Sequence, residues 1–307
     1  MKTPLVELKN YRNGNIRVFA KLEMMNPNGS IKDRIGEWLV NNAVYDGKVT
    51  GNTIIIEASS GNTGIGIAYA CLKRKIKCLL IIPDSTSKEK VQIMKSLGAE
   101  ILLIEGTIDD CIRTANIFSK RDNYLWLNQF DNSQCIDCHY YETAYEIEYQ
   151  LKNIICETEP ENYKPDSNWK YNPKEYKNIL VCAMGTTGTI MGCSKYLKEE
   201  KGWEIIGVQP KPNCKIEGLK NLDIQRIPKI FDKKAVDMIY QVGDKEAVQY
   251  MKELCKSEGI FGGPSTGAAF FVALRMALQQ LVGYRFRVNI VFICPDTGRN
   301  YMDSVWK

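Results

Sequence analysis

Residues 53–64 read TIIIEASSGNTG, an apolar run followed by a polar turn that leads into a helical pattern. The run from Thr53 to Glu57 is rich in β-branched residues, and apolar residues recur at helical spacing from Thr63 to Arg74. A plain helix cap needs only one Ser or Thr, so we interpret the richer turn as a pocket for a carboxylate or phosphate at a helix N-terminus. Its four hydrogen-bonding side chains are those of Ser59, Ser60, Asn62 and Thr63.

The same order of strand, turn and helix recurs along the chain. In the first half we predict strands at 53–57, 77–82, 100–105 and 124–127, and helices at 63–74, 87–97 and 108–120. In the second half we predict strands at 179–184, 204–209, 238–242 and 288–294, and helices at 190–199, 245–255 and 266–281. This alternation predicts an α/β fold of two doubly wound domains with mainly parallel sheets, in which ligands bind where strand ends meet Gly-rich turns.

The composition is that of an ordinary globular protein, because 44% of the 307 residues are hydrophobic and 25% are charged. Disordered and fibrous chains are excluded. The net charge of +5 is spread along the chain, so we expect no nucleic-acid partner and favour a small anionic ligand. The longest apolar stretches fall far short of the ~18 residues that a membrane span needs, and the first residues start no signal peptide. We therefore expect a soluble, cytoplasmic protein with no membrane partner.

Eleven cysteines are many, but the number is odd and most lie in apolar runs, where a thiol behaves as a small hydrophobe. We expect no disulfide framework. The stretch from Cys135 to His139 matches the CxxCH spacing of covalent haem attachment. No second Cys or His pair has matching spacing, so we predict neither haem nor a metal site. His139 is the single histidine, which also argues against a Ser/His/Asp hydrolase.

Three further turns have the composition of binding loops. One follows the strand at 179–184 and forms a phosphate cup without the lysine of a P-loop; it consists of Gly185, Thr186, Thr187, Gly188 and Thr189. In residues 262–267, Ser265 is a neutral partner for a ring nitrogen. In residues 26–34, Lys32 follows a Pro/Gly turn, where an amine forms a Schiff base if its surroundings lower its pKa. Each motif alone also has an ordinary explanation, as a βα turn or a surface lysine.

Residues 157–178 contain no aliphatic side chain and are rich in Glu, Asn, Pro, Lys and Tyr. Such a stretch contributes little to a core. We predict a long surface excursion between a helix that ends near Cys156 and the strand that begins at Ile179. An interdomain linker is the alternative.

The four turns together resemble those of the cysteine synthase family of pyridoxal phosphate (PLP) enzymes, the fold-type II group that also contains cystathionine β-synthase and the serine/threonine dehydratases. The pair GSIKDR at residues 29–34 and SGNTG at residues 60–64 is highly specific, and the resemblance covers residues 3–301. The cup MGTTGT at 184–189, with GVQP at 207–210 and EGIF at 258–261, is most similar to the B-type O-acetylserine sulfhydrylases.

This resemblance implies a tryptophan synthase β-like fold with an N-terminal domain at residues 1–140 and a C-terminal domain at residues 141–307. It also implies that the first ~30 residues pack with the C-terminal domain. A homodimer is the expected assembly.

The resemblance implies pyridoxal 5′-phosphate as cofactor and assigns roles by position. Lys32 would bind the cofactor covalently and later remove the substrate α-proton. Asn62 would bond the ring hydroxyl, Ser265 would face the pyridine nitrogen, and residues 185–189 would hold the phosphate. A serine in place of an acid at that nitrogen suits loss of a β-substituent better than transamination. The substrate α-carboxylate would be bound by Ser59, Ser60, Asn62, Thr63 and Gln129.

The implied reaction is β-elimination to an aminoacrylate intermediate followed by addition of a nucleophile, which interconverts L-cysteine, serine-type amino acids and hydrogen sulfide. Its direction stays open: a cysteine synthase, a transferase, adds sulfide, whereas a cysteine lyase expels sulfide and forms serine. A serine/threonine dehydratase is the alternative enzyme. A non-catalytic PLP-binding partner protein is the alternative from another class.

Asp232 departs from the family pattern, because B-type relatives tend to have a neutral residue there. We hypothesise that its carboxylate orients a water for attack on the aminoacrylate, as a hydroxyl-type cysteine lyase requires. The alternative is a turn or cap residue ahead of the strand at Met238.

Overall fold

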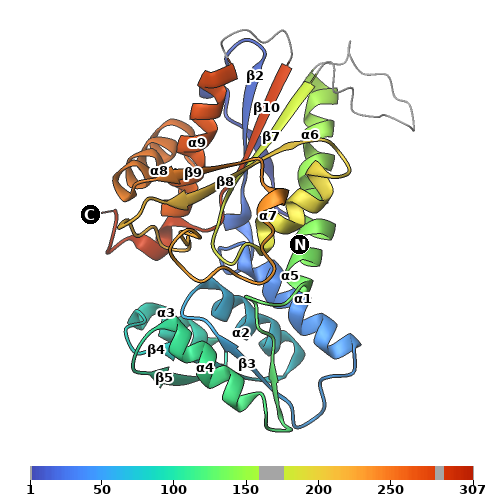
Figure 1. Ribbon diagram of the computed structural model, residues 1–307, viewed down its shortest axis with the longest axis vertical. Helices are drawn as coiled ribbons and strands as arrows, with labels where there is room; N and C mark the ends of the chain where they lie inside the picture. Colours follow the sequence, from blue (N-terminus) through green and yellow to red (C-terminus); the bar gives the residue numbers. More distant parts are fainter. Residues whose placement is uncertain (1, 159–175, 281–286, 307) are drawn as a thin grey trace. The chain divides into compact units, whose positions relative to one another are not determined.

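The computed structural model describes residues 2–158, 176–280 and 287–306, and its chain forms two compact units (Figure 1). The smaller unit is Asn26–Cys138. The larger unit combines Met1–Met25 with His139–Lys307. The first residues of the chain therefore belong to the same unit as its second half.

The smaller unit contains a parallel sheet in the order β5-β4-β3-β6. Its central strand β3 ends in a polar turn, and β6 ends in another. Because parallel strands end at the same edge of a sheet, the two turns lie at that edge. The strands are β3 (Ile54–Ala58), β4 (Lys77–Pro83), β5 (Glu100–Ile104) and β6 (Tyr124–Trp126), and the helices are α1 (Lys32–Tyr45), α2 (Asn62–Arg74), α3 (Lys88–Ser96), α4 (Ile108–Phe118) and α5 (Gln134–Cys138).

The larger unit contains a six-stranded sheet in the order β1-β2-β10-β7-β8-β9, in which only the β1–β2 pair is antiparallel. The prediction of an α/β fold with mainly parallel sheets is confirmed. The strands are β1 (Leu5–Glu7), β2 (Ile16–Lys21), β7 (Tyr176–Ala183), β8 (Glu204–Pro210), β9 (Met238–Val242) and β10 (Arg287–Ile293). The helices are α6 (Tyr145–Thr158), α7 (Gly188–Cys193), α8 (Asp244–Glu258) and α9 (Pro264–Gln280).

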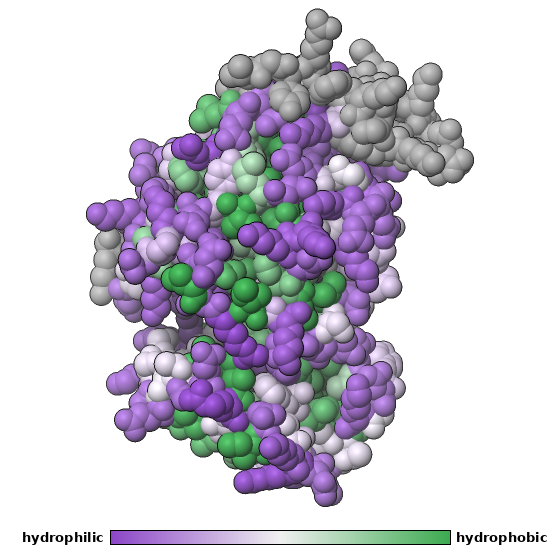
Figure 2. Space-filling view, in the orientation of Figure 1, coloured by the Kyte–Doolittle hydropathy of each residue, from purple (hydrophilic) through white to green (hydrophobic). Residues whose placement is uncertain are grey.

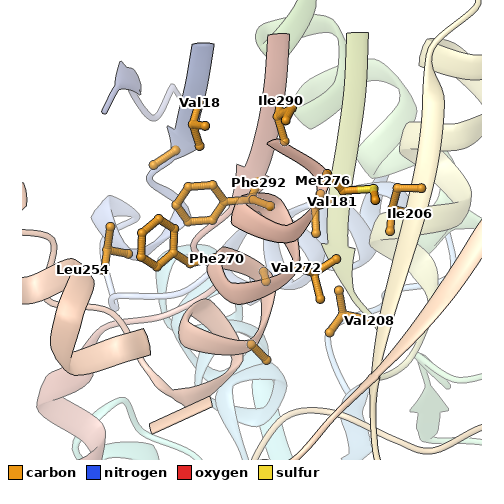
Figure 3. Packing of buried hydrophobic residues seen from close by; sticks show 14 of the residues in the cluster. Val18, Val181, Ile206, Val208, Leu254, Phe270, Val272, Met276, Ile290 and Phe292 are labelled. Carbon is orange, nitrogen blue, oxygen red and sulfur yellow. The ribbon is translucent and has the colours of Figure 1, made fainter. Parts of the chain in front are cut away.

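Helix α9 packs against this sheet through a continuous apolar cluster (Figure 3). The Phe270 ring lies with its centroid 5.4 Å from that of Phe292 on β10, and both side chains are fully buried. Each such burial contributes about 1.5–3 kcal/mol. The packing fixes α9 and so its first turn, which carries Ser265. Other members of the cluster are Val18, Val181, Ile206, Val208, Leu254, Val272, Met276 and Ile290.

The structure corrects two predictions about the second half of the chain. The helix predicted at 190–199 is α7 followed by a π-helical segment, Ser194–Lys198. The excursion predicted at 157–178 is wrong at its end, because β7 begins at Tyr176. Asn178 is buried in that strand, where its side-chain oxygen accepts a hydrogen bond of 2.9 Å from Asn289 Nδ2 on β10, so a polar residue occupies the sheet. Residues 159–175 of the predicted excursion lie outside the described residues.

On the face drawn in Figure 2, hydrophilic residues surround separate groups of hydrophobic ones. Among the helices of the described residues, none has the length and apolar character required to cross a membrane. No group of His, Cys, Asp and Glu within the described ranges is arranged to hold a metal ion. All eleven cysteines are free thiols, and most of them are buried.

Candidate active site

Lys32 is the first residue of α1 and is half-buried. Its backbone N–H donates to Ser30 Oγ over 3.2 Å. The next residue, Asp33, is fully buried and accepts hydrogen bonds from Asn28 N at 2.7 Å and Asn28 Nδ2 at 3.0 Å. Burial raises the pKa of Asp33, and the hydrogen bonds from Asn28 oppose this shift. Asp33, a residue of α1, thus anchors the turn that precedes Lys32 through its hydrogen bonds with Asn28.

Two glycines bring α1 and α2 into backbone contact. A Cβ added at Gly36 would lie 2.3 Å from the Gly66 carbonyl group, and one added at Gly66 would lie 2.5 Å from the Lys32 carbonyl oxygen. Real Cβ contacts are never this short, so only glycine permits the crossing. The crossing places the first turn of α1, with Lys32, beside the first turns of α2.

The turn between β3 and α2 is built around Ser59. Its buried Oγ accepts hydrogen bonds from Gly64 N at 3.2 Å and from Gly61 N at 3.4 Å. Ser60 and Asn62 remain partly exposed, and Asn62 is the first residue of α2. The Ser59 hydroxyl therefore shapes the turn, and its neighbours are the side chains accessible to a ligand.

Gln129 comes from the turn after β6 and contacts the same segment. Thr63 Oγ1 donates to Gln129 Oε1 over 2.6 Å, and both side chains are buried. The carboxamide oxygen is committed to Thr63, so the amide nitrogen supplies donors suited to an anion. The structure thus brings together in one unit the four residues of the predicted anion turn, Gln129 and the helix of Lys32.

In the larger unit, the predicted phosphate cup follows β7 directly. Thr187 has a left-handed backbone with φ of 67°, and its buried Oγ1 has no hydrogen-bond partner within the described residues. A Cβ added at Gly185 would lie 2.3 Å from the carbonyl oxygen of Gly218. A buried hydroxyl without a partner costs free energy, which an oxygen atom of a bound anion would recover.

Ser265 is the second residue of α9 and is buried. Its Oγ donates to Asp296 Oδ1 over 3.5 Å, and the Tyr301 hydroxyl donates to Asp296 Oδ2. A Cβ at Gly263 would lie 2.4 Å from Asp296 Oδ1. Burial raises the pKa of Tyr301, and the neighbouring Asp296 carboxylate adds to this shift. A carboxylate thus lies beside the serine that was predicted as a neutral partner for the ring nitrogen.

Asp232 is exposed and caps a short 3-10 helix, Lys233–Ala235, by accepting a hydrogen bond from Lys234 N at 2.9 Å. Its backbone N–H contacts Met191 Sδ of α7 at 3.2 Å. The cap interpretation therefore describes its observed contact. The role of orienting water stays a prediction, with the carboxylate anchored next to the helix that follows the phosphate cup.

The family model described as pyridoxal-phosphate dependent enzyme matches residues 1–296. The chain belongs to this family. It is 35% identical over 327 aligned positions to a cysteine synthase of Buchnera aphidicola subsp. Schizaphis graminum, covering 98% of this chain and 92% of the relative. It is 33% identical to an O-acetylserine dependent cystathionine beta-synthase of Bacillus subtilis, covering 98% and 94%. The resemblance inferred from the four turns is confirmed.

The solved structure of a hydrogen sulfide-producing enzyme from Fusobacterium nucleatum is similar to the chain, with a TM-score of 0.83 and 32% identity. The alignment covers 97% of this chain and 96% of that one. The fold-type II assignment is thereby supported over nearly the full length of both chains.

The residues present fit the cofactor of this pyridoxal-phosphate-dependent enzyme. The unpartnered Thr187 hydroxyl and the close backbone approach at Gly185 suit a phosphate group. Lys32 supplies a half-buried amine at the start of a helix. Both features come from the segments that sequence motifs had indicated.

Two buried residues lie beside the predicted site, and sequence reasoning assigned neither of them to it. His139 is fully buried, and its Nε2 lies 3.1 Å from Thr189 Oγ1 in the phosphate cup, while its Nδ1 lies 2.9 Å from Thr143 Oγ1. Glu57 is fully buried at the end of β3, where its Oε1 accepts a hydrogen bond from Ala58 N at 3.2 Å. For Glu57, the sequence signal was a single acid inside the apolar run TIIIEA at residues 53–58.

Proposed function

We propose that this enzyme performs β-replacement or β-elimination on small amino acids and interconverts L-cysteine, serine-type amino acids and hydrogen sulfide. The observation that carries the proposal is the Thr63–Gln129 contact in the same unit as Lys32, which combines a carboxylate-binding turn with an amine. The relatives support it, because their names describe sulfur amino-acid synthesis and sulfide production.

The cofactor would be held by residues from both halves of the sequence. Lys32 would bind it covalently, Asn62 would bond its ring hydroxyl, and Ser265 would face its ring nitrogen. The phosphate would be held by Gly185, Thr186, Thr187, Gly188 and Thr189. When bound, pyridoxal phosphate stabilises negative charge that develops at the substrate α-carbon.

The substrate α-carboxylate would be bound by neutral donors, those of Ser59, Ser60, Asn62, Thr63 and Gln129. Because these groups carry no charge, they would bind the carboxylate through hydrogen bonds alone. The amine of Lys32 would take the substrate α-proton as a general base. Loss of the β-substituent and its replacement by a nucleophile would complete the reaction.

The decisive experiment supplies the purified holoenzyme with O-acetylserine plus sulfide and, separately, with cysteine alone, and identifies every product by mass spectrometry. Cysteine formation supports a cysteine synthase. Serine and sulfide from cysteine support a lyase. Pyruvate and ammonia without a replacement product support elimination of the dehydratase type, in which no nucleophile replaces the β-substituent. The Lys32→Ala variant, as matched control, should lose turnover completely. Wild-type turnover by this variant would refute the proposal.

The lyase direction is the second candidate, and the carboxylate of Asp232 favours it. Its backbone contacts Met191 four residues beyond Thr187 of the phosphate cup, so its exposed side chain belongs to the same region of the larger unit. With cysteine as sole substrate, Asp232→Asn should reduce serine formation ~10²-fold if the carboxylate is a general base. Equal serine formation by variant and wild type would leave Asp232 as a helix cap only.

We also propose a cytoplasmic homodimer. Eleven free thiols suit a reducing compartment, which supports the location. Sedimentation equilibrium of the holoenzyme tests the assembly, and a monomer at micromolar concentration would contradict it.

A further inference from the structure

Glu57 lies at the end of β3, next to the two turns that supply the anion-binding side chains of the smaller unit. It is the single charged residue of β3, and its Oε1 accepts a hydrogen bond of 3.2 Å from the N–H of Ala58, the last residue of that strand. The turn after β6 lies beside it, because Ile56 pairs with Trp126 and Leu127 N donates to Ile56 O at 3.3 Å. The backbone N–H groups of Asn128 and Gln129 in that turn lower the pKa of the Glu57 carboxyl. The Trp126 indole is also near, although its Nε1 and Glu57 Oε2 form no hydrogen bond within the described residues.

The turn after β6 needs such support because its backbone is unusual. Asn128 has a φ of 51°, in the left-handed region that side chains other than glycine adopt at a cost in free energy. Two other contacts help: Asn132 Nδ2 donates to Leu127 O at 2.8 Å, and Cys135 Sγ donates to Gln129 O at 3.5 Å. Both satisfy carbonyl groups. Glu57, on the neighbouring strand β3, lies beside the N–H groups of this turn.

We propose that Glu57 is a positioning residue for the substrate carboxylate: buried where β3 pairs with β6, it supports the turn of Asn128 and Gln129 and thereby keeps the Gln129 carboxamide against Thr63. The inference rests on the proposed function, in which Thr63 and Gln129 bind the α-carboxylate. Glu57 itself touches neither substrate nor cofactor.

The positioning role requires a carboxyl without charge. Burial raises the pKa of Glu57 to about 8, against the opposing effect of the surrounding N–H groups, so the group is mainly neutral at pH 7. A negative charge at this place would lie behind donors that bind an anion and would weaken the binding. Within the described residues, the Glu57 charge raises the pKa of two thiols, Cys78 on β4 and Cys135 on α5. Lys32 and Asp137 also act on Cys135, and Cys71 and Glu100 also act on Cys78.

The test compares the steady-state kinetics of holoenzyme variants with the amino-acid substrate that the wild type turns over. Glu57→Ala should raise KM ~10-fold or more and change kcat less than ~3-fold, because binding of the carboxylate is lost equally in ground and transition states. Glu57→Gln should restore KM to within ~3-fold of the wild type, since its amide oxygen still accepts from the backbone. As control, Glu23→Gln changes a fully buried carboxyl in the larger unit and should leave KM unaltered.

The pH profile separates positioning from a general structural effect. In the wild type, KM should rise above pH 8 as Glu57 loses its proton, and Glu57→Gln should lack this added rise. An equal pH dependence of the two proteins overturns the inference. An unchanged KM in Glu57→Ala also overturns it. So does a loss of kcat in Glu57→Ala that Glu57→Gln shows as well.

Hydrogen exchange tests the inference without turnover. Residues 126–131 should exchange faster in Glu57→Ala holoenzyme than in the wild type, and equal exchange would overturn the inference. If the wild type turns over none of the substrates, the proposed function fails while faster exchange would still support the positioning contact. If Glu57→Ala does not fold, the pH dependence of KM in the wild type and in Glu57→Gln decides whether the inference holds.

Discussion

Glu57→Gln should make the protein more stable at neutral and alkaline pH. In the unfolded chain this carboxyl loses its proton near its ordinary pKa of 4.5, whereas in the folded protein burial keeps the proton up to about pH 8. Between these values the unfolded chain binds fewer protons than the folded protein, so the wild type loses stability as pH rises. Glutamine stays neutral throughout and removes this loss.

The magnitude follows from the two pKa values. The difference between 4.5 and about 8 corresponds to about 5 kcal/mol over the whole window, at about 1.36 kcal/mol per pKa unit. Between pH 5.5 and 8.5 the advantage of Glu57→Gln over the wild type should therefore grow by about 3 kcal/mol. Urea unfolding of both proteins at several pH values measures it, because the comparison cancels titrations that they share.

Glu246→Gln serves as a control of opposite sign. Lys211 hydrogen-bonds Glu246 and lowers its pKa, so the wild-type residue adds stability as pH rises through the acidic range. The effect on stability is small, because the Lys211–Glu246 ion pair is exposed to solvent. A difference between Glu57→Gln and the wild type that stays constant from pH 5.5 to 8.5 would refute a neutral Glu57.

Three further changes test the construction of the site. Gly36→Ala should destabilise the smaller unit by about 2 kcal/mol or more, because its Cβ would collide with Gly66, whereas Gly51→Ala meets open space; thermal unfolding of both variants checks this. His139→Asn should weaken cofactor affinity ~10-fold through the loss of support for Thr189, measured by equilibrium titration of the apoenzyme with pyridoxal phosphate. Unchanged affinity would contradict that support. Ser265→Asp should retain the cofactor yet change the product ratio, since an acid at the ring nitrogen alters its protonation; an identical product ratio would argue against the contact.

The fold class follows directly from the sequence. Parallel strands buried on both faces require apolar runs such as that before Ser59, and the helices that cover them have apolar residues at helical spacing. The segments carrying Lys32, Asn62 and residues 185–189 were found for a similar local reason. Glycines and hydroxyl residues concentrate where a chain must turn closely around an anion, and this composition is visible without any partner.

The atoms and strands in contact between distant segments were decided only by the tertiary structure. The resemblance implied that the first ~30 residues pack with the C-terminal domain, but no local pattern indicates that β2 (Ile16–Lys21) pairs with β10 (Arg287–Ile293). Gln129 reaches Thr63, and His139 reaches Thr189, from other elements of their units. Glu57 is an acid in an apolar strand, and burial in the folded unit raises its pKa. The charge and partners of such residues depend on the whole surrounding fold, so local sequence patterns do not contain them.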